Sequence, residues 1–249
     1  MQNDIDEGKV KPGQYFVLTF DFSKVRPNPN LTEANEALIK FLNSTIEAFY
    51  ETYAAYLGRN FADLCQEIDS KYPNISLQRY TQSVRGAIKQ GGRFAGIEGI
   101  NVLVDKFDAF PNNYLELQQT VGEPKTAWEN TAVGLTFKSF WSTVKSLGGE
   151  GFIRRVFITA ISPLSLSSVR SSFNVLRNLS FHRDLAGLCC LTHSNLEDAL
   201  KQMGKEPEEC NRVLSGMTES FNGYHFCKDE TVQTVYNTET GLADLQRLI

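Results

Sequence analysis

An almost continuously apolar stretch that ends in an acid constrains the fold of this chain more than any other feature. Residues 100–107 read INVLVDKF, and the stretch is stopped by Pro111 and two asparagines. A strand without regular polar alternation is typical of a parallel strand that is covered on both faces. Two further short strands are expected at residues 15–22 (YFVLTFDF) and 155–161 (RVFITAI), with helical segments between them. Strands that alternate with helices predict an α/β fold with a mostly parallel sheet.

The helical segments follow from apolar residues that recur at steps of three and four. A long helix is expected to be capped by Thr32 and to stop at Gly58, and its aromatic stripe is interpreted as core. Further helices are expected at residues 61–71, at 77–90 and around Phe137 and Trp141, and a short one at 195–203. The segment 221–224 (FNGY) is expected to be a turn.

The pattern changes after residue 166 to short helices, which predicts a division of the chain into three parts. Residues 1–14 are expected to form a mobile N-terminal segment. Residues 15–165 are expected to form the α/β core, and residues 166–249 a helical, lid-like subdomain.

Composition restricts the classes of partner and location. The chain has 249 residues, 41% of them hydrophobic, which is enough to bury a sizeable core. Its formal charge of -4 and the lack of a long basic run make nucleic acid an unlikely partner for this chain. The polar first residues contain no apolar leader, and no uninterrupted apolar stretch approaches the ~18 residues that suggest a membrane span. We therefore expect a cytoplasmic protein without a membrane segment.

Cysteine and histidine spacing gives no indication of a metal cage formed by the protein alone. The five cysteines form an odd set without CxxC pairs, which favours free thiols in a reducing compartment. The three histidines lie far from any paired cysteine or carboxylate spacing that suggests a metal.

Asp105, at the end of the most apolar strand, is the strongest candidate for a functional residue. Ligands of open parallel sheets bind at the carboxyl ends of the strands. An acid at that point can hold the Mg²⁺ that neutralises triphosphate charge. The alternative is a solvated aspartate that merely ends a strand.

A loop able to cradle phosphates is not found in the sequence. Such a loop has the pattern GxxxxGK[ST] between a strand and a helix. The glycine-rich stretch from Gly91 to Gly96 has the glycine spacing, but Ile97 and Glu98 occupy the lysine and hydroxyl positions, and it precedes a strand. We interpret it as an ordinary turn.

Six segments in order resemble the predicted AAA-ATPase-like family, which is found widely in fungi and bacteria. They are YFVLTFDFS (15–23), NVLVDKFDAFPN (101–112), RVFITAISPLSLSS (155–168), FNVLRNLSFHRDLAGLCCLT (173–192), FNGYHF (221–226) and VYNT (235–238). Each segment is weak alone, but together they cover nearly the whole chain.

The resemblance implies a three-layer P-loop NTPase fold with Asp105 as the Walker B aspartate and Ser162 near the sensor strand. The strands would be ordered sensor, Walker B and then residues 15–22. Relatives begin with a further strand and a Walker A phosphate loop before the segment that matches 15–23, whereas this chain starts only a few residues ahead of it. We therefore expect an incomplete sheet that lacks the first strand and the Walker A segment.

A second departure from the family concerns the catalytic base, the residue that activates the attacking water. The family pattern has Asp-Glu at the strand end, where the glutamate can activate the attacking water, and here Lys106 follows Asp105. An ammonium group cannot serve as a base at neutral pH unless its pKa falls by several units. Asp108 is the candidate to replace the glutamate. Arg154 and Arg155 are candidates to reach a γ-phosphate, the alternative being solvated arginines at the start of a strand.

Three hypotheses about function remain. The first is a degenerate or truncated AAA-ATPase-like domain, a pseudo-ATPase, with weak or absent hydrolysis. It would bind a protein partner through the sheet edge at residues 156–161 or through the helical subdomain, or bind itself through that edge. The second is an ATP-hydrolysing P-loop NTPase whose phosphate loop lies upstream, with Mg-ATP as its cofactor and Asp105 as the metal ligand. The third is a secreted or host-directed effector with an upstream targeting segment.

Overall fold

The computed structural model describes residues 6–8, 12–26, 28–91, 96–113, 130–160 and 177–248. The chain divides into two compact units, residues 1–174 and 175–249, which are described separately. The boundary expected after residue 165 falls within 161–176, outside the described residues. Much of the segment 1–14, which was expected to be mobile, is also outside them, so the predicted domain limits stay predictions.

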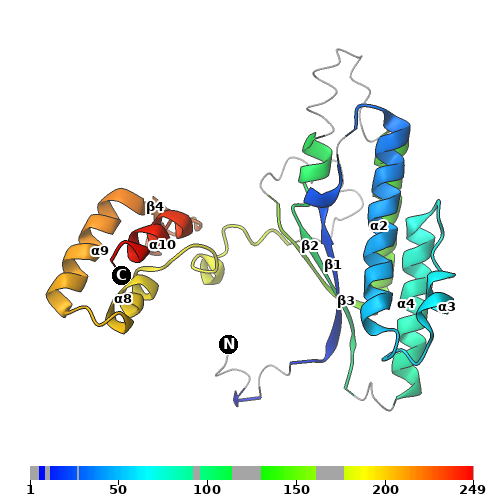
Figure 1. Cartoon of the computed structure of the whole chain (residues 1–249), viewed down its shortest axis with the longest axis horizontal. Helices are drawn as coiled ribbons and strands as arrows, with labels where there is room; N and C mark the ends of the chain where they lie inside the picture. Colours follow the sequence, from blue (N-terminus) through cyan, green and yellow to red (C-terminus); the bar gives the residue numbers. More distant parts are fainter. Residues whose placement is uncertain are drawn as a thin grey trace. The chain divides into compact units, whose positions relative to one another are not determined.

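The first unit contains a parallel sheet of three strands (Figure 1). They are β1 (Tyr15–Asp21), β2 (Gly99–Asp105) and β3 (Ile153–Ile158). The strand order is β1-β2-β3, so β2 lies in the centre. The three expected strands, their parallel direction and their order are confirmed. β2 ends at Asp105, two residues before the predicted end, and β3 begins two residues before its predicted start.

Three long helices pack on one face of this sheet (Figure 1). They are α2 (Leu31–Tyr53), α4 (Pro73–Gln90) and α6 (Ala132–Gly149). Phe16, Leu18 and Phe20 of β1 point toward them and are buried in one hydrophobic core. The aromatic stripe of α2 contributes Phe49 and Tyr50 to the same core, as its interpretation as core requires.

The opposite face of the sheet is only partly covered. Val17, Leu103 and Phe157 are 41%, 39% and 47% exposed. The expectation that the central strand is covered on both faces was wrong for this part of the chain. The described residues of the first unit form two layers, and a third layer is not seen among them.

Several helix limits differ from those expected. α2 is capped by Asn30, whose side chain accepts from the N–H groups of Thr32 and Glu33, so the predicted cap Thr32 lies inside the first turn. The helix ends at Tyr53 and is followed by turns up to Gly58, which has a φ of 65°. The helix expected at 61–71 is the short α3 (Phe61–Cys65). α4 begins at Pro73, a residue well suited to the first helical position because it has no N–H to satisfy.

The second unit is mainly helical. Its elements are η4 (Arg183–Leu185), α8 (His193–Gln202), α9 (Pro207–Phe221), α10 (Thr238–Gln246) and the antiparallel strands β4 (Asn222–Tyr224) and β5 (Val235–Tyr236). Leu196, Leu214, Met217 and Tyr236 belong to its core. Residues 221–224, expected to be a turn, form the end of α9 and strand β4. No helix in the described ranges is long and apolar enough to cross a membrane.

Candidate site at the carboxyl ends of the strands

Asp105 is the last residue of the central strand, and its exposed side chain is held by a neighbouring strand. The hydroxyl of Thr159, which follows β3, donates to Oδ1 of Asp105 at 2.6 Å. The N–H of Thr159 donates to the carbonyl of Val104 at 2.8 Å, and its carbonyl accepts from the N–H of Phe107 at 3.0 Å. These backbone bonds fix Thr159, and Thr159 in turn fixes the direction of the carboxylate.

The chain turns sharply after Asp105. Lys106 has a φ of 50°, a left-handed backbone conformation that residues other than glycine seldom adopt. The next residue, Phe107, is fully buried, with its ring centroid 5.2 Å from those of both Phe137 and Trp141. Burial of Phe107 therefore directs the backbone into the core and leaves Asp105 and Lys106 exposed at the edge of the sheet.

A second carboxylate, that of Asp21, lies at the same edge. Asp21 is the register partner of Asp105, so their Cα atoms are ~5 Å apart, the spacing of adjacent strands. Its Oδ1 accepts from the hydroxyl of Ser23 at 2.6 Å and from the Ser23 N–H at 3.1 Å. Chiefly the hydroxyl bond, with smaller contributions from the charges of Lys24 and Lys106, holds the pKa of Asp21 below its ordinary value.

Asp108 lies in a different environment from Asp105. It is only 2% exposed, its carbonyl accepts from the N–H of Asn112 at 2.9 Å, and its Oδ2 is 3.4 Å from the side-chain amide of Asn112. The structure therefore does not present Asp105 and Asp108 to solvent together. The role of Asp108 as a base stays a prediction.

Two of the residues expected near a phosphate are not brought to Asp105 by the described structure. Arg155 is the register partner of Asn101, four residues before Thr159. That separation is ~13 Å along a strand, so Arg155 lies toward the opposite end of the sheet. Ser162 is outside the described residues, and its role stays a prediction.

Asp21 and Thr159 were missed as site residues by sequence reasoning. Both follow from the strand order that the sequence does predict, because parallel neighbours of a central strand end at the same edge of the sheet. Each is also the polar residue that follows an apolar run, in LTFD and VFIT respectively.

The model of one family, described as Predicted AAA-ATPase, matches residues 3–170. The chain belongs to this AAA-ATPase-like family. The match includes all three strands of the sheet and the residues at their carboxyl ends. No curated protein and no solved structure matches the chain.

The carboxylates of this AAA-ATPase-like domain suit Mg²⁺ only with help from other ligands. Within the described ranges, no three histidine, cysteine, aspartate or glutamate side chains group as a metal site. Mg²⁺ commonly binds through one or two carboxylates together with water and substrate phosphates. Exposed Asp105, with Asp21 beside it, matches this donor set.

Proposed function

We propose that this chain is a degenerate AAA-ATPase-like domain in which nucleotide hydrolysis is weak or absent and whose role is to bind a protein partner. The observation that carries the proposal is the identity and arrangement of the residues at the end of β2. Asp105 is exposed and held by Thr159, as a magnesium ligand should be, but Lys106 follows it where the family pattern has a glutamate. The half of the site that holds a metal is retained, and the half that activates water is not.

Magnesium bound at this edge would neutralise phosphate charge. Asp105 would hold it through the carboxylate, while the Thr159 hydroxyl keeps Oδ1 in one orientation. Asp21 has both oxygens engaged, one by Ser23 and the other by Lys24 at 3.8 Å, so it contributes negative charge more readily than a direct bond. This division of roles resembles a P-loop NTPase site without its phosphate loop.

Lys106 does not supply the carboxylate with which the family pattern activates water. Its side chain lies in an exposed turn. Loss of a general base typically lowers a rate by about two to four orders of magnitude. Because Asp108 is buried, we do not assign it the role of the missing base. We therefore expect this domain to hydrolyse ATP weakly or not at all.

A second candidate function is ATP hydrolysis with a phosphate loop supplied from upstream. The hydrogen bond from Thr159 to Asp105 favours it, because it holds the carboxylate at the strand end where a metal-bound nucleotide would lie. Under this alternative Asp105→Ala abolishes turnover of the extended protein.

The partner role is supported by the edge of β3. Among the described residues β3 pairs only with β2, and an unpaired strand edge can pair with another chain. Thr159 directs its N–H to β2, so by alternation the peptide groups of Val156 and Ile158 point to the open edge. This edge could bind a partner or a second copy of the chain.

Size-exclusion chromatography tests the edge. Self-association that increases with concentration, and that is lost in Val156→Pro, would support pairing through β3. The substitution removes an N–H that points outward, which an edge strand tolerates. A clean monomer at high concentration, in the wild-type chain, would count against self-association.

ATP turnover tests the hydrolytic half of the proposal. Wild-type chain, Asp105→Ala and Lys106→Glu are compared under single-turnover conditions with Mg²⁺ and radiolabelled ATP. We expect the wild-type rate to equal that of Asp105→Ala. A wild-type rate that Asp105→Ala removes would favour the second candidate.

A further inference from the structure

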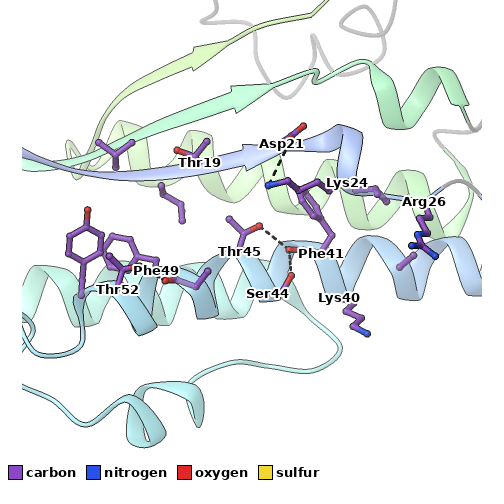
Figure 2. A pocket seen from close by; sticks show the side chains of 16 residues that line it. Thr19, Asp21, Lys24, Arg26, Lys40, Phe41, Ser44, Thr45, Phe49 and Thr52 are labelled. Atoms are coloured by element: carbon purple, nitrogen blue, oxygen red, sulfur yellow. Dashed lines mark hydrogen bonds and ion pairs between the residues drawn. The ribbon is translucent and has the colours of Figure 1, made fainter.

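A groove runs along the outer edge of β1 beside helix α2 (Figure 2). It measures about 800 Å³. Its lining residues come from β1, the turn that follows it and one flank of α2. This surface is separate from both the strand ends and the open edge of β3, because β1 and β3 are opposite edges of the sheet.

The backbone of β1 offers unpaired hydrogen-bonding groups to this groove. The carbonyl of Gln14 accepts from the N–H of Glu98 at 2.7 Å, so residue 14 faces β2. Peptide groups alternate along a strand, so Val17 and Thr19 direct their N–H and C=O groups to the opposite side, the open edge. In the part of the chain that the structure describes, no strand pairs with that side.

The flank of α2 leaves room beside this edge. Ser44, Ala48 and Thr52 are small and exposed, and they follow one another at the four-residue step of a helix face. The hydroxyls of Ser44 and Thr45 both donate to the carbonyl of Phe41 at 3.0 Å (Figure 2). Because their own helix satisfies these hydroxyls, the surface they form does not require a polar ligand and can accept apolar side chains.

One end of the groove is positively charged. Lys24, Arg26 and Lys40 lie there, with Asp21 as the acidic lining residue. Lys24 Nζ is 3.8 Å from Asp21 Oδ2, whereas Arg26 and Lys40 form no ion pair with any described residue. In a chain with a net charge of -4, two cations without ion pairs beside an open strand edge favour an acidic ligand.

We propose that this groove binds an extended, acidic segment of a partner protein, which adds to the sheet as a strand beside β1. Main-chain bonds to Val17 and Thr19 would supply affinity, as in other cases of β-strand addition. Alternate apolar side chains of the segment would lie over Ser44, Ala48 and Thr52. Acidic residues at one end of the segment would bind Arg26 and Lys40.

A second copy of the chain fits this groove less well. Two β1 strands paired edge to edge would be about 4.8 Å apart. α2 lines the groove beside β1, so such a pair would bring the α2 helices of both copies toward each other, although packed helices need axes 8–10 Å apart. A single extended segment carries no such helix.

The test begins with selection of linear peptides from a random display library on the purified chain. We expect the selected peptides to alternate apolar residues and to carry aspartate or glutamate toward one end. The best peptide is then labelled, and its Kd is measured by fluorescence anisotropy on the wild-type chain and on variants. Failure to select any peptide above background would overturn the proposal.

Three variants report on three parts of the groove. Thr19→Pro removes an outward N–H, Ala48→Trp fills the exposed flank of α2, and Arg26→Glu with Lys40→Glu reverses the charge. Each variant should raise the Kd of the peptide at least about tenfold, which is the size of effect expected from losing one or two net hydrogen bonds. Arg85→Glu, an exposed charge reversal on α4, is the matched control and should leave the Kd unchanged.

Circular dichroism confirms that each variant is folded, and Ala48→Trp remains informative should Thr19→Pro unfold the chain. Equal affinity for wild type and for Ala48→Trp would overturn the proposal. So would dimerisation of the chain that Thr19→Pro abolishes, because the groove would then belong to a second copy. Peptide binding is measured without nucleotide, so its outcome is independent of ATP turnover, and the groove variants distinguish binding beside β1 from binding at the β3 edge.

Discussion

The hydroxyl of Thr159 donates to the carboxylate of Asp105 at 2.6 Å, across the ends of two neighbouring parallel strands. The bond joins a residue that follows β3 to the last residue of β2. It therefore lies at the carboxyl ends of the strands, where ligands of parallel sheets bind. It also explains why the side chain of Asp105 has one orientation although it is exposed. The candidate site is thus organised by the fold before any ligand arrives.

The bond between Thr159 and Asp105 should be measurable as a coupling energy. Thr159→Val and Asp105→Ala, singly and together, form a double-mutant cycle on the free energy of unfolding in urea. We expect a coupling of about 1 kcal/mol, the usual net value of a hydrogen bond in a protein. Effects of the two substitutions that simply add would show that the hydroxyl does not orient the carboxylate.

Asp21 should titrate below its ordinary value of 3.8, because the hydroxyl and N–H of Ser23 donate to its ionised form. A group whose pKa is lowered by folding stabilises the fold above its unfolded pKa, and this contribution is lost as the pH falls through the folded pKa. Ser23→Ala should raise the pKa of Asp21, measured by carboxyl-carbon NMR. The wild type should be more stable than Ser23→Ala at pH 7, and the difference should shrink below pH ~4. A difference in stability that is independent of pH would contradict this assignment.

Two buried tyrosines should respond in opposite directions to loss of the hydroxyl. Tyr80 is fully buried and its hydroxyl has no hydrogen-bond partner among the described residues, whereas the hydroxyl of Tyr50 donates to Glu67 at 3.1 Å. Tyr80→Phe should raise the free energy of unfolding by about 1 kcal/mol, because an unsatisfied buried polar group is removed. Tyr50→Phe should lower it by about the same amount. Urea denaturation of the two variants side by side checks both signs, and destabilisation by Tyr80→Phe would indicate a hidden partner.

The sequence predicts the sheet well because hydrophobic burial decides it. Apolar runs predicted the three strands and the position of Asp105 at the end of the central one. Their alternation with helices predicted the parallel direction. The order followed from the family resemblance. Helix starts were less accurate, since capping by Asn30 and entry at Pro73 are local choices among several polar residues.

Residue proximity at the site depends on register, which a single sequence does not specify. The pairing of β2 with β3 shifts between Ile100 and Asn101, and this irregularity places Arg155 beside Asn101, one residue farther from Asp105 than an unbroken register would. The burial of Asp108 likewise depends on the turn at Lys106. The left-handed backbone of Lys106 is not predicted by any local sequence pattern. Thr159 acts through a hydrogen bond that exists only once the strands have paired, whereas the bonds from Ser23 to Asp21 are local.

The decisive measurement is single-turnover hydrolysis of ATP, with the wild-type chain in excess and Asp105→Ala beside it. We expect both proteins to release phosphate at the same rate, indistinguishable from buffer with Mg²⁺, because Lys106 stands in the place of the base. A wild-type rate well above buffer that disappears in Asp105→Ala would instead identify a working ATPase.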